Sequence, residues 1–175
     1  MIKNLIIAVV VVLLGVGGWV LYGGGSGSSS IPDISLWMKS EGNNISFSYP
    51  ERFESLYVIP QAWPPILEIA SYPYECPEGE RTLPTKEIGK ISKRTIGGTE
   101  YCRQEKIGAA AGSAYHQFVY ETIYDGKHFS LAFSLQYPNC NNFATDDEQN
   151  MCREGQSAFD VDSLVGRLMK TTSVR

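Results

Sequence analysis

Four cysteines are the residues of this chain best suited to covalent chemistry. An even number of cysteines in an oxidising compartment is typical of disulfides. Of the three possible pairings we favour Cys76–Cys102 and Cys140–Cys152, because each pair brackets a local excursion of the chain. The second pair would close a thirteen-residue loop, which the chain-entropy model values at about 3 kcal/mol. Zinc is the alternative, but the sequence has no C-x-x-C and neither histidine has the spacing of a zinc ligand.

The two histidines are the side chains best suited to acid–base chemistry near neutral pH. Counting residues from an Asp125–Gly126 turn predicts that His116 lies on the core face of its strand and His128 on the opposite face, so the two cannot share a metal or a substrate. Ser113 lies near His116 but lacks the G-x-S-x-G elbow of a serine nucleophile. We therefore interpret both histidines as structural, and we predict no catalytic, cofactor-binding or metal-binding residue.

An oxygen-rich stretch around the last two cysteines is a second candidate for metal binding. Calcium takes six to eight oxygen ligands, and the stretch offers Asn139, Asn141, Asn142, Asp146 and Asp147. The spacing is not that of an EF-hand, and acidic residues equally suit the N-terminus of a helix. We favour the helix and keep calcium as the alternative.

Aromatic residues braced by prolines are the candidates for partner binding. Trp63 precedes Pro64 and Pro65, and Tyr72 and Tyr74 flank Pro73. Rigid aromatic side chains on loops lose little entropy when they bind, which protein interfaces exploit. The alternative for Trp63 is that its side chain folds back as a lid on the core.

Strands and tight turns must position these residues. Apolar residues alternate with serines in Asn44–Tyr49 and stop at Pro50, which predicts a short strand. Gly97–Gly98 and Asp125–Gly126 predict two-residue hairpin turns. The second turn would put Tyr120 opposite Leu131 and Phe118 opposite Phe133.

Two helices are expected at the C-terminal end. Thr145 and Glu148 have the spacing of a capping box, and Gly155 is expected to end that helix. A last helix is expected from near Ser157, with an apolar stripe at i, i+3, i+4, i+7 and i+8 formed by Val161, Leu164, Val165, Leu168 and Met169.

The N-terminal segment predicts the compartment. Residues 5–22 carry no charge, and as a helix they would span about 27 Å, close to the ~30 Å of a bilayer core. Lys3 precedes the run, so we expect residues 1–22 to be a transmembrane anchor with its N-terminus in the cytoplasm. A cleaved signal peptide is the alternative. Residues 23–30, GGGSGSSS, predict a flexible linker.

Residues 31–175 have the length of one domain. We expect an α+β fold, an antiparallel β-sheet with helices packed on it, preceded by one transmembrane helix. The chain has a formal net charge of −4 and no basic stripe interleaved with aromatic residues. This composition excludes nucleic acid as the expected partner.

Two segments carry a resemblance to a known family. ISFSYPERFE (residues 45–54) resembles the opening strand and Tyr-Pro turn of PsbP-like domains, and FDVDSLVGRLMKTTSVR (residues 159–175) is similar to their closing helix and short strand. The resemblance implies an α/β/α sandwich around an antiparallel sheet, a fold that usually binds or docks without chemistry. It assigns no metal and no cofactor.

These observations favour a membrane-tethered, extracytoplasmic binding or accessory domain without catalysis, on the cell membrane with its domain outside. Its expected partners are the membrane, through residues 5–22, and a protein of the cell envelope. The alternatives are a cell-envelope hydrolase that uses Ser113 or carboxylates, and a purely structural envelope component.

Overall fold

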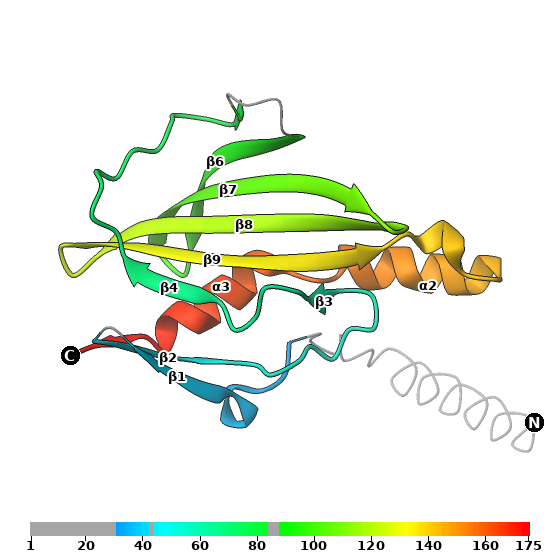
Figure 1. Ribbon diagram of the computed structural model, residues 1–175, viewed down its shortest axis with the longest axis horizontal. Coiled ribbons are helices and arrows are strands. Elements are labelled where there is room, and N and C mark those ends of the chain that lie inside the picture. The colour runs from blue at the N-terminus through cyan, green and yellow to red at the C-terminus, as the bar shows by residue number, and fades with distance from the viewer. Residues whose placement is uncertain (1–30, 43, 84–87) are drawn as a thin grey trace, which may run out of the picture.

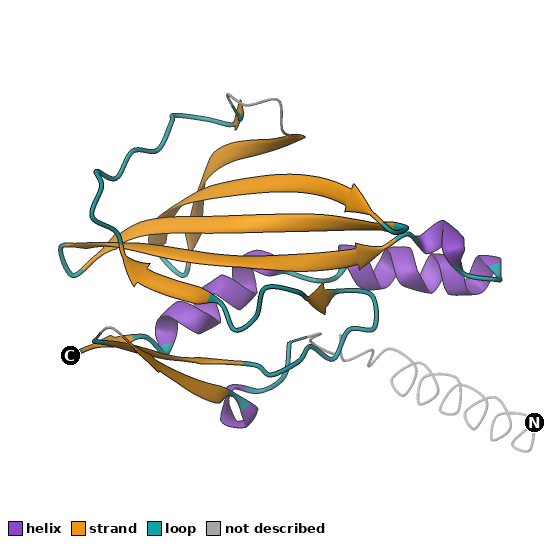
Figure 2. Ribbon diagram, in the orientation of Figure 1, coloured by secondary structure: helices purple, strands orange, loops and turns teal. Residues whose placement is uncertain are grey.

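The computed structural model describes residues 31–42, 44–83 and 88–175. The main feature of this part of the chain is one large antiparallel sheet (Figures 1 and 2). Its strand order is β3-β9-β8-β7-β6-β5, and β4 also pairs with β9. The strands are β3 (Ile59–Pro60), β4 (Ile66–Ile69), β5 (Arg81–Thr82), β6 (Ile88–Ile96), β7 (Thr99–Ala110), β8 (Ser113–Tyr124) and β9 (Lys127–Pro138).

A smaller sheet and the helices lie on one side of the large sheet (Figure 1). The smaller sheet has the order β1-β2-β10, with β1 (Met38–Gly42), β2 (Ile45–Tyr49) and β10 (Ser173–Val174). The helices are α2 (Asp146–Ser157) and α3 (Val161–Lys170), with the short 3-10 turns η1 (Ile34–Leu36) and η2 (Cys140–Asn142).

Strands β6 to β9 form a meander joined by three two-residue turns. The central residues are Gly97–Gly98, Ala111–Gly112 and Asp125–Gly126, and all six have positive φ. Such turns match the right-handed twist of the paired strands. Tyr120 pairs with Leu131 and Phe118 with Phe133, so the predicted register of the last hairpin is confirmed.

The core lies between the inner face of the large sheet and a layer made by α3 and β2. Leu164 and Val165 of α3 are fully buried there, beside Phe47 of β2. The predicted apolar stripe is therefore confirmed, although α3 begins at Val161, where the Asp160 side chain caps it.

Helix α2 forms with the predicted capping box, in which Thr145 and Glu148 each accept from the other's backbone N–H. It does not end at Gly155, as expected, but continues to Ser157. A Cβ atom at Gly155 would lie 2.5 Å from the ring of Tyr57. The glycine therefore serves close packing inside the helix, not its termination.

The expected fold class is wrong. Strands hold 46% of the described residues and helices 20%, with only two α-helices among them, so the fold is mostly antiparallel β-sheet and not an α+β sandwich. The physical reason is that β2 and apolar side chains of the following loop, such as Phe53 and Val58, occupy the core positions beside α3 that a sandwich would give to further helices. No helix in the described residues is long and apolar enough to cross a bilayer. The anchor expected over residues 1–22 and the linker over 23–30 lie outside the described residues.

One connection crosses the outer face of the large sheet, the face away from α3, at the end of the sheet near the β8–β9 turn (Figure 1). We call this segment, residues 70–80 between β4 and β5, the strap (Figure 1). It contacts His128 of β9, Glu121 of β8, Cys102 of β7 and Lys93 of β6 in turn. The strap therefore joins one edge of the sheet to the other.

Candidate functional site

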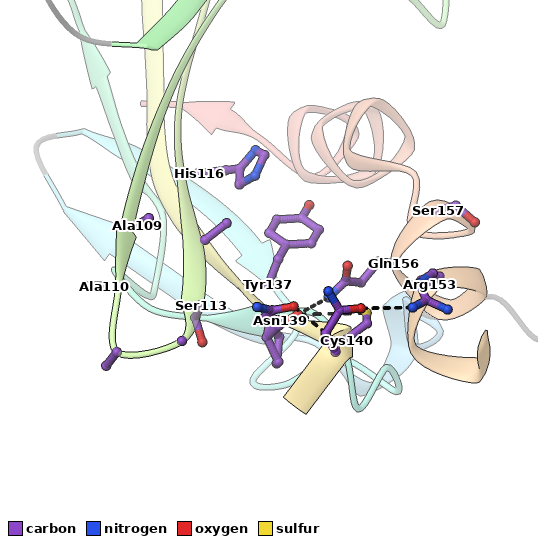
Figure 3. A pocket seen from close by; sticks show the side chains of 15 residues that line it. Ala109, Ala110, Ser113, His116, Tyr137, Asn139, Cys140, Arg153, Gln156 and Ser157 are labelled. Carbon is purple, nitrogen blue, oxygen red and sulfur yellow. Dashed lines mark hydrogen bonds between the residues drawn. The ribbon is translucent and has the colours of Figure 1, made fainter. Parts of the chain in front are cut away.

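A large cleft lies at the end of the large sheet, between the β7–β8 turn and α2. Its volume is about 940 Å³. The sheet side is lined by small residues from Ala109 to Ala114 and by the side chains of His116 and Tyr137, which point into the cleft (Figure 3). The helix side is lined by Arg153, Gln156 and Ser157.

His116 is held by a buried carboxylate on the neighbouring strand. Its Nδ1 lies 2.7 Å from Oε1 of Glu105, and Oε2 of Glu105 accepts from Arg103 at 2.8 Å. The hydrogen bond from His116 lowers the pKa of Glu105, against the opposing effect of burial, and the charge of Arg103 adds to the lowering. Because the ionised carboxylate can only accept, Nδ1 carries the proton and Nε2 of neutral His116 is an acceptor.

Tyr137 stands beside His116, with 4.6 Å between the two ring centroids. Burial raises the pKa of Tyr137 to about 12, so the phenol stays neutral at physiological pH. The hydroxyl of Tyr137 makes no hydrogen bond with any of the described residues. The cleft thus presents a hydroxyl that can both donate and accept next to a ring nitrogen that can accept.

A second cavity of about 520 Å³ shares His116 and Tyr137 with the cleft and extends towards the start of α3. Here Arg103 lies 3.6 Å from Asp162, which also accepts from the Tyr120 hydroxyl at 2.5 Å. The Arg103 guanidinium packs over the ring of Phe118, 5.1 Å from its centroid. These contacts fix Arg103, which in turn fixes Glu105 and His116.

Internal hydrogen bonds and a disulfide fix the opposite wall. Gln156 donates to the carbonyl of Pro138 at 2.7 Å, and Arg153 donates to Asn141 Oδ1 at 2.9 Å. Cys140 and Cys152 form a disulfide with 5.5 Å between their Cα atoms. The wall is therefore joined to the end of β9 by covalent and polar contacts.

Cys76 and Cys102 form the other disulfide, also with 5.5 Å between Cα atoms, and it ties the strap to β7. Both pairings are those that the sequence favours. The zinc and calcium alternatives find no support in the described ranges, where no three His, Cys, Asp or Glu side chains are grouped to hold a metal. The side-chain oxygen of Asn139 is used locally, because it accepts from the backbone of Asn141.

Ser113 and His116 lie on opposite faces of β8. The Ser113 hydroxyl accepts from Gln136 Nε2 at 2.9 Å, on the outer face of the sheet, whereas His116 points to the core side. The structure therefore does not bring Ser113 and His116 together, as a hydrolase with Ser113 as its nucleophile would need. His128 lies on the outer face, as its position relative to the turn predicts.

The three aromatic residues expected to bind partners lie in two places. Trp63 is half-buried against the rings of Phe53 and Phe133, and its indole N–H donates to the carbonyl of Pro50 at 2.7 Å. Tyr72 and Tyr74 belong to the strap on the outer face. Tyr72 is 49% exposed, and Tyr74 packs against His128. Partner binding by these residues stays a prediction.

Sequence reasoning missed Glu105 and Tyr137. The signal that could have found Glu105 is the Ala111–Gly112 turn. If it is read as a two-residue turn, Ile107 pairs with His116, and Glu105, two residues before Ile107, shares the inner face with His116. Tyr137 follows from the predicted β8–β9 register, because it pairs with Ala114, two residues before His116.

Comparison with known proteins adds no name to this site. No family model matches the sequence, and no curated protein matches it either. The resemblance to PsbP-like domains stays a prediction.

Proposed function

We propose that the chain is a binding domain held at the outer surface of a cell membrane by the apolar run at residues 5–22, and that it binds its ligand in the cleft beside His116. The observation that carries the proposal is the unused hydrogen-bonding capacity in the cleft. His116 Nε2 and the Tyr137 hydroxyl line a cavity of about 940 Å³, and neither has a partner among the described residues.

The architecture of the cleft supports binding. Ligand sites are concave, mostly apolar and largely pre-formed, with a few polar groups fixed in place. Here the apolar part consists of alanine side chains at the β7–β8 turn. The polar groups are fixed by Glu105, Arg103 and the Cys140–Cys152 disulfide. A ligand would therefore meet a site that needs little reorganisation.

The membrane part of the proposal rests on the sequence of residues 1–30, and the two disulfides support an oxidising compartment outside the cytoplasm. An alkaline phosphatase fused after Arg175 should be active in intact cells. Carbonate extraction should leave the full-length chain with the membrane. A soluble chain shortened near Gly25 would instead show a cleaved signal peptide.

A hydrolase is the second candidate, and one observation favours it. A histidine oriented by a carboxylate, with its other nitrogen facing a cleft, can act as a general base. His116 and Glu105 have this arrangement. A hydrolase would release products from a bound ligand, whereas the proposed binding domain returns it unchanged.

Site-specific photocrosslinking in intact cells tests the binding proposal. A crosslinking residue at Ala109, exposed on the cleft wall, should give a discrete adduct. The matched control is the same residue at Gln117, which is exposed on the outer face of β8. Equal labelling at both positions, or none at Ala109, would contradict binding in the cleft.

A further inference from the structure

We infer that the cleft binds a neutral, hydroxyl-rich ligand, a saccharide of a few rings. The inference rests on the proposed function and names the ligand class for the same site. It follows from four properties of the cleft: its free hydrogen-bonding atoms, its charges, its apolar wall and the short strand edge beside it.

The free polar atoms of the cleft include both donors and acceptors. In the neutral ring of His116, Nε2 accepts, because Nδ1 donates to the ionised Glu105. The Tyr137 hydroxyl both donates and accepts. Gln156 uses its amide N–H for the carbonyl of Pro138, which leaves its Oε1 as a further acceptor. A ligand that satisfies these atoms must offer groups that donate as well as accept, and a hydroxyl does both.

The charged groups at the cleft are already engaged. Arg103 lies between Glu105 and Asp162 in the adjoining cavity. Arg153 lines the cleft itself; it is exposed and donates to the neutral side-chain oxygens of Asn141, Gln149 and Asn150. No Asp or Glu lines the cleft itself within the described residues. In the described part of the chain, the cleft therefore offers a cation no carboxylate, and it offers an anion only Arg153, whose N–H groups are shared among three amide side chains.

The wall formed by the β7–β8 turn is apolar and shallow. It carries the methyl groups of Ala109 and Ala114, which pair across β7 and β8 on the same face as His116, and the ring of Tyr137 stands beside it. A pyranose ring has C–H groups on its faces and hydroxyls around its edge, so it can place one face against this wall and its edge towards His116 and Tyr137. An amphipathic aromatic side chain suits such a ligand for the same reason.

The turn is also held close to the opposite wall. Gly112 has φ +73°, and a Cβ there would lie 2.8 Å from the side-chain nitrogen of Asn142. That nitrogen donates to the Gly112 carbonyl at 3.3 Å. The contact ties the β7–β8 turn to η2, and the volume of the cleft beside it, about 940 Å³, lies within the ~300–1,000 Å³ of small-ligand sites and suits a ligand of a few rings.

An extended peptide fits the cleft less well. Peptides that add to a sheet need an open strand edge. At this end β9 pairs with β8 on one side and with β3 on the other, and β7 and β8 are closed by their turn. The carbonyl of Pro138 is taken by Gln156, and proline has no N–H to donate. Within the described residues, the pairing of β6 with β7 stops at Ile88 and Ile107, so the strand edge left to a peptide beside the cleft is residues 108–110, a ladder of three residues at most.

Calorimetric titration of the full chain tests the inference. The protein is kept in a detergent without a sugar head group, and the probes are the N-acetylglucosamine trimer, inorganic phosphate and tri-alanine. We expect the trimer to bind with a dissociation constant below about 1 mM and the other two probes to bind at least tenfold more weakly. Tyr137→Phe should weaken trimer binding by about five- to tenfold, the effect of one hydrogen bond.

Two further variants make the test decisive. Tyr115→Phe is the matched control, because Tyr115 lies on the outer face of β8. The affinity of this variant for the trimer should equal that of the wild type. Ala109→Trp fills the exposed cleft wall and should abolish binding without unfolding the protein, as the thermal melting curve checks.

Three results would overturn the inference that the ligand is a saccharide. They are no heat of binding from the trimer, tighter binding of phosphate or tri-alanine than of the trimer, or a loss of trimer affinity in Tyr115→Phe equal to that in Tyr137→Phe. If the Ala109 crosslink still forms in cells while the trimer fails, the ligand class is wrong and binding in the cleft stands. If the crosslink also fails, the proposed function is wrong.

Discussion

Two histidine–glutamate pairs lie on opposite faces of the large sheet. On the inner face, His116 Nδ1 is 2.7 Å from Glu105, and its other nitrogen lies at the cleft. On the outer face, His128 Nδ1 donates to the carbonyl of Tyr72 at 2.9 Å, and its Nε2 is 3.8 Å from Glu121. That Nε2 is buried without a hydrogen-bond partner.

The difference between the pairs comes from what covers them. The strap lies over His128, and the rings of Tyr72 and Tyr74 pack edge-on against the imidazole at centroid distances of 5.0 and 5.5 Å. No segment among the described residues covers His116 in this way, and its free nitrogen borders a cavity. The same two residue types thus hold a segment in place on one face and are available to a ligand on the other.

The largest expected effect comes from freeing the strap. Replacing Cys76 and Cys102 together by serine should lower the free energy of unfolding by about 3–4 kcal/mol, because the unfolded chain regains the entropy of a long loop. Urea denaturation measures the loss. The comparison predicts that His128, but not His116, then becomes more reactive towards diethyl pyrocarbonate.

The matched control for that variant is the other disulfide. Replacing Cys140 and Cys152 by serine should cost about 3 kcal/mol and loosen the cleft wall, with His128 still protected by the strap. Equal exposure of His128 in both variants would show that the strap is not what shields it.

Glu105→Gln should have the next largest effect. It leaves the guanidinium of Arg103, which is 15% exposed, without its closest anion, and breaking such a buried pair costs about 3 kcal/mol. Glu121→Gln, on the outer face, changes a carboxylate that is 18% exposed and accepts the Tyr72 hydroxyl, and it should cost about 1 kcal/mol. Urea denaturation at pH 7 compares the two, and equal losses would contradict the difference between the faces.

The Glu105 variant also predicts a pH dependence. The pKa of Glu105 is lowered in the folded protein from its ordinary value of 4.5. Its contribution to stability is therefore present above pH 4.5 and is lost as the pH falls through the lower, folded-state pKa. The loss of stability between pH 5 and pH 2 should be smaller in Glu105→Gln than in the wild type. An unchanged acid profile would show that Glu105 is not the group that titrates.

Tyr137→Phe tests the burial of the cleft phenol at alkaline pH. Burial raises the pKa of Tyr137 from 10.0 to about 12, so its proton stabilises the folded state below pH 10, and that contribution is lost as the pH rises from 10 to 12. The variant should lose less stability over this interval, by at most about 2 kcal/mol. Absorbance titration at 295 nm should show one tyrosine fewer titrating near pH 12.

The smallest effect is expected for Tyr72→Phe on the strap. It removes a hydroxyl that donates to Glu121 from a residue that is 49% exposed. A solvent-accessible hydrogen bond contributes about 0.5–1 kcal/mol, and the disulfide still holds the strap. A loss above about 2 kcal/mol in thermal or urea unfolding would show that Tyr72, and not the disulfide, is the main fastening.

The sequence predicts the β8–β9 hairpin and the faces of both histidines because Asp125–Gly126 is a turn signal that local chemistry enforces. The sequence does not predict the Ala111–Gly112 turn between β7 and β8. Alanine rarely adopts positive φ, and Ala111 has φ +48°. Without that turn the register of β7 is unknown, and Glu105 cannot be placed beside His116.

The fold class fails for a different reason. The crossing of the strap and the pairing of β10 with β2 join segments far apart in the sequence, and local periodicity carries no information about such contacts. The disulfides are the exception, because the even number of cysteines and their spacing restrict the long-range pairings to three.

The attachment of Ile31 has a mechanical consequence. The guanidinium of Arg167, on α3, donates to the carbonyls of Ile31 and Pro32, and the Trp37 indole donates to the same Pro32 carbonyl. A pull on the chain ahead of Ile31 would therefore load α3 through Arg167 before it reached the pairing of β2 with β10. Helix α3, which covers the core, would therefore bear the force first. The large sheet and its cleft would keep their shape until the hydrogen bonds of Arg167 to Ile31 and Pro32 broke.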